Sequence, residues 1–166
     1  MSGDDGRPTG AQRGADDQGA RRSGTTPQQW VVLDQVLAGA RPGTVLRGDD
    51  GSGDAADRAA QLGRRAGWSV VLLDTTGALD KAALLDRCQQ AFGFPEWFGH
   101  NWDALADSLS EVEHPVGTLV LWTGWDGLAR ADAPAFGTAV EVLTERAASA
   151  VARPFAVLLV APGQQG

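Results

Sequence analysis

Apolar residues fall along this chain in two kinds of pattern, short runs that suit buried strands and spaced positions that suit amphipathic helices. Strands are predicted at residues 43–47, 68–73, 118–122 and 155–160. Helices are predicted at residues 54–66, 80–92, 102–112 and 134–151. The apolar-rich segment 29–37 fits either a short helix or a strand, and the Gly-, Ala- and Asp-rich stretch after residue 122 is predicted to be a connector. The nearly continuous apolar run at 68–73 is typical of a strand covered on both faces.

Several of the predicted helices have recognisable ends. Asp80 and Asn101 are predicted N-caps, because side chains of this type accept hydrogen bonds from first-turn amides. Gly93 is expected to end the helix that Asp80 begins, and Pro95 prevents its continuation. Pro134 suits the first turn of the last helix.

The order of these elements predicts an α/β fold with a small, mostly parallel sheet flanked by helices. Residues 68–162 are expected to form the main domain, and residues 29–67 an N-terminal strand–helix extension packed on it. Residues 1–28 contain four Asp, four Arg and almost nothing apolar, which predicts a disordered tail.

Composition limits the classes of function. The net charge of −7 and the pI of about 4.7 argue against direct binding of nucleic acid or an anionic membrane, and they favour a basic partner. The single cysteine, Cys88, allows no internal disulfide and is expected to be a buried core residue. No apolar run reaches the roughly 18 residues of a membrane span, and the N-terminus has no signal-peptide core, so a cytoplasmic location is expected. No cofactor is predicted.

The segment from Cys88 to Ala129 contains six acidic residues and no lysine or arginine. Three of the acids, Asp103, Asp107 and Glu111, recur every four residues within the predicted helix at 102–112. On a helical wheel they lie about 100–180° from Trp102, whereas the apolar positions lie at about 280–340°. One face therefore suits the core and the opposite face presents carboxylates, either to solvent alone or to a positively charged partner.

The loop before this helix contains two adjacent aromatic residues, Trp97 and Phe98, followed by Gly99. Two neighbouring aromatics in a loop do not easily both point into the core, so at least one is expected at the surface, where aromatics often serve as binding hot spots. The alternative is that both hold the loop against the domain.

Residues 94–109, with the sequence FPEWFGHNWDALADSL, resemble the signature of the barstar family of intracellular ribonuclease inhibitors. The resemblance is ungapped over this segment and extends, in the order of strands and helices, over residues 68–160. It implies a barstar-like fold and a partner that is a basic, barnase-like ribonuclease. In this family the helix and the loop before it enter the enzyme's RNA-binding cleft, and the inhibitor binds one-to-one as a monomer.

The resemblance also implies which residues contact the enzyme. They are Trp97, Phe98, Gly99, Asn101, Trp102, Asp103, Ala106, Asp107, Ser110 and Glu145. Asp107 matches the acid that enters the catalytic cleft, Asp103 the acid one turn earlier, and Trp97 an aromatic that packs on the catalytic edge. Glu145 corresponds to a family acid on the last long helix, through an alignment that needs a gap before the final strand.

Two positions depart from the best-known member of the family. His100 stands where that protein has an acid, and Ala106 where it has a large aromatic that touches the enzyme. These departures favour a cognate enzyme other than barnase. They also leave open an antitoxin or regulatory module that binds a different basic protein.

A carboxylate-based enzyme or a metal protein is the remaining alternative. His100, Asp103 and Asp107 have a spacing that could suggest ligands, but His100 precedes the helix cap and no second His or Cys completes a coordination sphere. The sequence therefore predicts no metal site and no catalytic residues.

Overall fold

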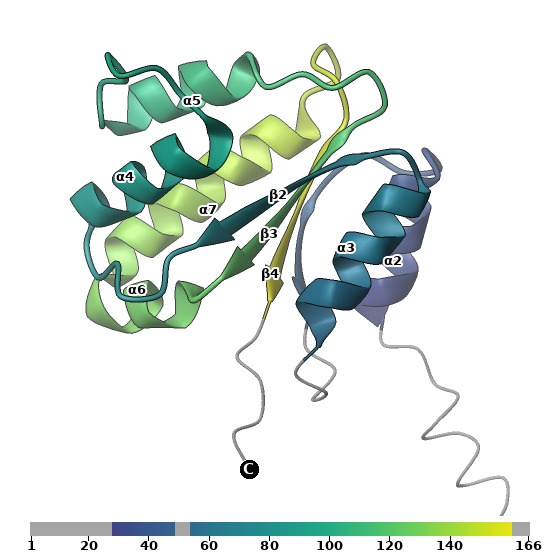
Figure 1. Cartoon of the computed structure of the whole chain (residues 1–166), viewed down its shortest axis with the longest axis horizontal. Coiled ribbons are helices and arrows are strands. Elements are labelled where there is room, and N and C mark those ends of the chain that lie inside the picture. Colours follow the sequence, from purple (N-terminus) through teal and green to yellow (C-terminus); the bar gives the residue numbers. More distant parts are fainter. Residues whose placement is uncertain (1–27, 49–53, 161–166) are drawn as a thin grey trace, which may run out of the picture.

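Four strands pair in parallel in the order β1-β4-β3-β2 (Figure 1). They are β1 (Val45–Gly48), β2 (Ser69–Asp74), β3 (Thr118–Thr123) and β4 (Phe155–Val160). The computed structural model describes residues 28–48 and 54–160, and within them the predicted α/β fold with a small parallel sheet is confirmed.

Helices cover both faces of the sheet (Figure 1). One face carries α2 (Gln28–Leu37) and α3 (Ala55–Arg65). The other carries α4 (Lys81–Phe92), α5 (Trp102–Ser110), α6 (Trp125–Ala131) and α7 (Ala133–Ala148). Within this second layer α5 packs on α7, and none of the other described helices or strands covers its outer side.

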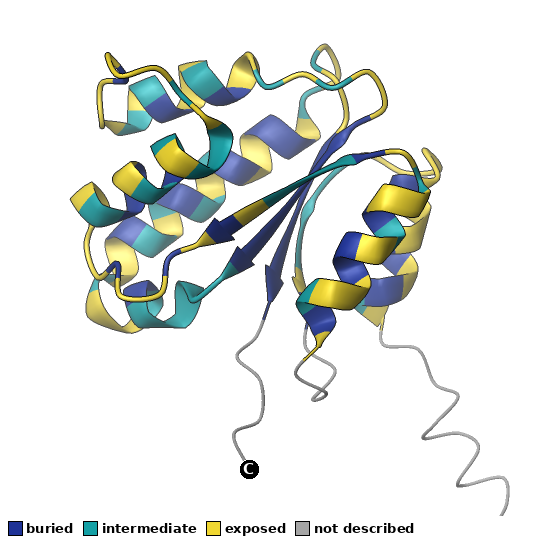
Figure 2. Ribbon diagram, in the orientation of Figure 1, coloured by how far each residue is buried: buried dark blue, intermediate teal, exposed yellow. Residues whose placement is uncertain are grey.

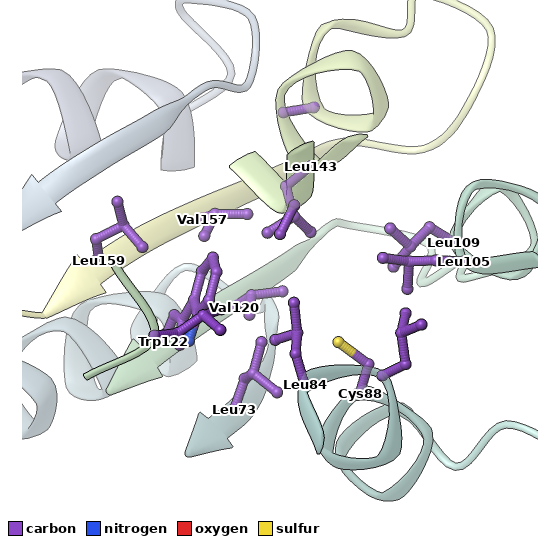
Figure 3. Packing of buried hydrophobic residues seen from close by; sticks show 14 of the residues in the cluster. Leu73, Leu84, Cys88, Leu105, Leu109, Val120, Trp122, Leu143, Val157 and Leu159 are labelled. Atoms are coloured by element: carbon purple, nitrogen blue, oxygen red, sulfur yellow. The ribbon is translucent and has the colours of Figure 1, made fainter. Parts of the chain in front are cut away.

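The core consists of two apolar clusters, one on each face of the sheet (Figure 2). Figure 3 shows side chains of the cluster on the face that carries α4, α5 and α7. Successive strand residues point to opposite faces, so Val120 and Val157 pack towards α4 and α7, whereas Leu119 and Leu158 pack towards α2 and α3. All of them are fully buried. Each such side chain contributes about 1.5–3 kcal/mol by leaving water, which explains why the central strands β3 and β4 are apolar at nearly every position.

The strand β2 differs from its prediction, because it lies at an edge of the sheet. Val70 packs against the α2–α3 cluster, but Leu72, two residues later on the same face, is 60% exposed. The expectation that this strand is covered on both faces is therefore wrong for β2. An apolar run records the tendency to form a strand, but not the position of the strand in the sheet.

The predicted connector after residue 122 contains the short helix α6. Gly124 precedes it with φ 71°, and a Cβ there would lie 2.4 Å from the backbone nitrogen of Thr76, so only glycine fits this close approach. Trp125 donates its indole N–H to the carbonyl oxygen of Val160 at 2.9 Å, and Leu128 is buried. Because the segment begins with glycine and aspartate, its sequence did not predict this helix.

The helices predicted at 102–112 and 134–151 end earlier, at Ser110 and Ala148.

The segment 29–37 is helical, which decides between its two predicted alternatives. This helix buries Trp30, Leu33 and Val36 in the apolar cluster that it shares with α3 and the sheet. The Trp68 indole N–H donates a hydrogen bond to the Leu37 carbonyl oxygen at 3.2 Å. The described part of the extension thus adds two helices and a strand. The predicted tail, residues 1–28, lies outside the described residues except for Gln28, and the division into residues 29–67 and 68–162 stays a prediction.

Candidate partner-binding surface

The start of α5 is fixed by Asn101, as its sequence predicts. This residue has extended backbone angles, and its side-chain oxygen accepts a hydrogen bond from the Ala104 amide at 2.7 Å. Its side-chain nitrogen donates to the Gly99 carbonyl at 3.2 Å. A Cβ at Gly99 would lie 3.2 Å from that nitrogen and 3.3 Å from the Ala104 Cβ, so the loop lies closely against the first turn. Asn101 and Gly99 therefore set the position of the loop relative to the helix.

The two loop aromatics point in opposite directions. Phe98 is 5% exposed, and its ring centroid lies 5.1 Å from that of Phe94 and 4.9 Å from that of His100. Trp97 is 82% exposed. The Phe98 amide donates to the Pro95 carbonyl at 3.0 Å, and this hydrogen bond closes the turn that contains both aromatic residues. Phe98 thus holds the loop on the domain, and Trp97 projects into solvent.

The two faces of α5 separate as the helical wheel predicts. Leu105 and Leu109 are fully buried, whereas Asp103 and Asp107 on the helix and Glu111 at its C-cap are exposed. For these three acids the structure records no ion pair with any described residue. Like charges one turn apart cost a few tenths of a kcal/mol per pair. This cost is not relieved within the described part of the chain.

The remaining predicted positions on α5 surround this row of acids. Trp102 is half-buried, and the chain's only lysine, Lys81, places its Nζ 5.5 Å from the Trp102 ring centroid. Ala106 and Ser110 are exposed, and the Ser110 hydroxyl donates to the Asp107 carbonyl at 2.5 Å. The structure thus collects the predicted residues of α5 on one side of the molecule.

Arg146 on α7 holds the other end of α5, and no pattern in the sequence predicted this role. Its Nε donates to the Leu109 carbonyl at 2.7 Å and one terminal nitrogen to the Val112 carbonyl at 2.6 Å. The other terminal nitrogen donates to the Arg153 carbonyl at 3.0 Å. The guanidinium also lies 4.6 Å from the Phe155 ring centroid, and the residue is only 7% exposed. Arg146 therefore adds a donor to the Leu109 carbonyl, which also accepts the Val112 amide at 3.0 Å, and supplies a donor to the Val112 carbonyl just beyond the end of α5.

Burial lowers the pKa of Arg146, while the nearby Glu113 carboxylate acts in the opposite direction. The guanidinium remains charged at any physiological pH. The positive charge of Arg146 at the C-terminal end of α5 also interacts favourably with the helix dipole. Sequence spacing could not reveal this role, since the carbonyl groups of Leu109 and Val112 lie 37 and 34 residues away.

Glu145 is exposed on α7 and lines a surface hollow together with Ala106 and Ser110 of α5. Glu145, whose alignment with the family acid needs a gap, thus lies close to the exposed residues of α5. We call the exposed residues of this region the α5 surface: Trp97, Asp103, Ala106, Asp107, Ser110, Glu111 and Glu145.

The described residues give little support for a metal site, a reactive thiol or a membrane-spanning helix. Among them, no three His, Cys, Asp or Glu side chains gather as a metal site would require. Cys88 is buried, and burial raises the pKa of its thiol to about 12. In the segments that the structure describes, no helix combines the length and the apolar character needed to cross a bilayer.

Comparison with protein families gives one match. The family model described as Barstar (barnase inhibitor) matches residues 68–160, which is more than half of the chain. This range includes β2, β3, β4, the helices α4 to α7 and the whole α5 surface, and it leaves α2, β1 and α3 outside. No curated protein matches the chain. The chain therefore belongs to the barstar family of barnase inhibitors.

Proposed function

We propose that this chain is a stoichiometric inhibitor of a basic, barnase-like ribonuclease and blocks its active-site cleft with α5 and the loop before it. The family match supports a role of this general kind. The observation that carries the specific proposal is the exposed row of Asp103, Asp107 and Glu111, for which no ion pair is recorded among the described residues.

Carboxylates suit a cleft that binds RNA, because such a cleft uses basic side chains to hold phosphate groups. Asp103 and Asp107 would form charge-assisted hydrogen bonds with those side chains, which are stronger than neutral ones. The net charge of −7 would also speed the encounter with a basic enzyme. Trp97, 82% exposed beside the acids, would add a large apolar contact of the kind that dominates many interfaces.

Contacts within the domain hold the α5 surface in place, so few of its side chains and loop residues would have to become ordered on binding. The Asn101 cap, the buried Phe98 ring and the three hydrogen bonds of Arg146 hold the loop and both ends of the helix. A preorganised surface loses less conformational entropy on association. These supports favour tight binding without large rearrangement, and one α5 surface per chain favours a one-to-one complex of a monomeric inhibitor.

Calorimetric titration into a barnase-like ribonuclease that the chain inhibits tests the role of Asp107. Asp107→Ala should weaken binding by about 2–5 kcal/mol, because the enzyme's cations would stay buried without their partner. This range is the general cost of truncating one partner of a buried, hydrogen-bonded charge pair, a class for which barnase and barstar are the standard example. Asp34→Ala is the matched control, since Asp34 is exposed on α2, on the other side of the sheet, and should leave the affinity unchanged. Equal affinities for the two variants would contradict the assigned role.

A second candidate is an antitoxin or regulatory module for a different basic protein. The exposed His100 and Ala106 favour it, because they alter the charge and the shape of the surface relative to the best-known family member. Co-purification of the chain with a basic protein that has no nuclease activity would support this candidate. We propose the cytoplasm as the place of action in either case, since the single cysteine leaves nothing for an oxidising compartment to cross-link.

A further inference from the structure

The strand β1 forms the edge of the sheet opposite β2. It lies outside residues 68–160, so the family match assigns it no role. In the strand order only β4 pairs with β1, and no strand of the described residues lies on its other side. One row of main-chain groups on β1 is therefore without a strand partner in this part of the chain, which makes the edge a template for a further strand.

The register of β1 on β4 shows which main-chain groups face outward. The Val157 amide donates to the Thr44 carbonyl at 3.0 Å, and Val45 lies opposite Val157. Alternate residues of a parallel strand bond to the same neighbour, so Leu46 continues the pairing with β4. Val45 and Arg47 consequently turn their N–H and C=O groups away from β4. These two residues present two donors and two acceptors to a further strand.

A hollow of about 340 Å³ lies beside this edge, between β1 and α7. It is lined by Thr44, Val45, Arg47, Phe136, Gly137, Val140, Thr144 and Leu159. This volume is near the lower end of ligand pockets, about 300–1,000 Å³, and suits one large side chain better than a cofactor. Gly137 keeps the hollow open, since even a Cβ at this position would meet no atom within 4 Å. We call this hollow, together with the outward main-chain groups of Val45 and Arg47, the β1 groove.

Arg47 gives the β1 groove a positive charge. Its guanidinium carbon lies 4.9 Å from the centroid of the Trp125 ring, and Trp125 stacks on Phe136 with 5.6 Å between the ring centroids. Arg47 is exposed, and the structure records no ion pair between it and any described residue. The other residues that line the hollow carry no charge, so an acidic group of a ligand would meet a single cation beside an apolar wall.

We propose that the β1 groove binds an extended segment of a second protein, which pairs with β1 as an additional, antiparallel strand. A large apolar side chain of this segment lies opposite Val45 and fills the hollow, and an acidic residue two positions earlier lies opposite Arg47. Directly opposite residues of an antiparallel pair point to the same face, which sets this order of acid, any residue and apolar residue. Strand addition of this kind takes its affinity from main-chain hydrogen bonds and its specificity from alternate side chains.

The bound segment has to come from another molecule of different sequence. Residues 1–27, 49–53 and 161–166 lie outside the described structure, and they contain no acid followed two positions later by Val, Leu, Ile, Met, Phe or Trp. A second copy that paired β1 with β1 about a two-fold axis at Leu46 would place Val45 opposite Arg47 and leave both arginines without an acid. The β1 groove shares no residue with the α5 surface, so the site does not depend on the inhibitor role.

The direct probe is the peptide acetyl-Gln-Thr-Glu-Thr-Leu-Thr-Gln-amide, titrated into the whole chain and followed by amide hydrogen exchange. The Val45 and Arg47 amides should exchange rapidly in the free chain, because no strand receives them. At a peptide concentration of about ten times Kd, their exchange should slow about tenfold. The Leu46 amide, already paired with β4, should change little. No saturable binding, or binding that leaves the Val45 and Arg47 exchange rates unchanged, would overturn the proposal.

Two N-methylated peptides test the main-chain pairing. Methylation at the leucine removes the N–H that faces the Val45 carbonyl, and it should weaken binding about tenfold or more. Methylation at the threonine between glutamate and leucine alters an N–H that faces away from β1, and it should leave the affinity unchanged. Equal affinities of the two methylated peptides would contradict strand addition.

Two side-chain changes in the peptide test its order. Alanine in place of the leucine should weaken binding about tenfold, because less apolar surface enters the hollow. Glutamine in place of the glutamate should weaken binding about two- to fivefold, because an opposite-charge pair across the strands is lost. An alanine peptide that binds as well as the leucine peptide would mean that the hollow is not used, and the proposal would fail.

Variants of the chain localise the site. Gly137→Leu should block the peptide by filling the hollow and should keep the fold, since leucine favours a helix more than glycine does. Gln61→Leu is the matched control, because it adds an exposed leucine to α3 on the other face of the sheet. Circular dichroism and the melting temperature establish that each variant is folded. Equal binding of the peptide by both folded variants would refute the site.

Arg47→Gln should abolish the preference for the glutamate peptide over its glutamine form. Arg41→Gln is the control for charge, because Arg41 is exposed in the loop before β1 and does not line the hollow. The same loss of preference in both variants would mean that the peptide responds only to general positive charge, which would contradict the pairing with Arg47.

Sedimentation of the chain alone distinguishes a partner segment from a second copy. A monomer is expected, and a dimer that Gly137→Leu dissociates would mean that a second copy occupies the groove, which would overturn the proposal. Asp107→Ala should leave peptide binding unchanged, because Asp107 belongs to the α5 surface. The peptide site and ribonuclease inhibition are therefore tested separately, and either can fail while the other stands.

Discussion

Replacing Arg146 by methionine should lower the free energy of unfolding by about 2–4 kcal/mol. The substitution keeps the length and most of the volume of the side chain but removes every hydrogen-bond donor. The carbonyl groups of Val112 and Arg153 would then lose the donor that the structure gives them, whereas the Leu109 carbonyl would keep the Val112 amide. An unsatisfied buried polar group costs about 1–3 kcal/mol, so two of them cost about 2–6 kcal/mol. The lower part of this range applies, because Arg146 borders the surface hollow and both carbonyls are only partly buried.

Urea denaturation followed by circular dichroism measures this effect. The midpoint should fall while the slope with urea concentration stays constant, since a lower slope would indicate a change in the surface exposed on unfolding. The control is Arg130→Met, because the Arg130 side chain is 74% exposed and its ion pair among the described residues is with Asp126 at 3.1 Å. An exposed pair of this kind contributes about 0–1 kcal/mol. A loss below 1 kcal/mol for Arg146→Met, or equal losses for both variants, would refute the conclusion that Arg146 holds the end of α5.

Two further predictions follow from the same structure. Asn101→Ala should destabilise the protein by about 0.5–2 kcal/mol, because the Ala104 amide loses its cap; urea denaturation measures the loss, and an unchanged midpoint would contradict the capping role. Cys88 should resist Ellman's reagent at pH 8 until the protein unfolds, because burial raises the pKa of its thiol from 9.0 to about 12. The folded state keeps this proton between pH 9 and pH 12, whereas the unfolded state loses it, so stability should fall as the pH rises through this window. The fall is about 1.4 kcal/mol per pH unit for one group, and Cys88→Ala should lack this part of the slope; equal slopes in both proteins would contradict the burial effect.

Local chemistry in the sequence predicted both ends of α4 and the start of α5. Asp80 accepts a hydrogen bond from the Ala83 amide, Gly93 ends α4 in a left-handed conformation with φ 71°, and Asn101 caps α5. Each of these features depends on groups within three or four residues. For the same reason the helical wheel separated the buried Leu105 from the exposed acids correctly.

Features that depend on distant parts of the chain could not be predicted in this way. The edge position of β2 follows from the order of the four strands, which no apolar run encodes. Arg146 resembles any charged residue of an amphipathic helix until α5 and the Arg153 carbonyl are placed beside it. The opposite orientations of Trp97 and Phe98 also needed the fold, because either ring could have filled the space beside Phe94. The hollow beside Ala106 needed the packing of α5 on α7.

The most direct test of the proposed function is inhibition, by the purified chain, of RNA cleavage by barnase-like ribonucleases, beside an Asp103→Asn/Asp107→Asn double variant. The amide substitutions keep the shape of both side chains and remove their charge. We predict that inhibition saturates at one chain per enzyme, weakens as salt is added, and is lost in a double variant that remains folded. Inhibition that is equally strong in the double variant would contradict the acidic row as the blocking element. The absence of any inhibition by the folded native chain would contradict the assignment of a barnase-like ribonuclease as the partner.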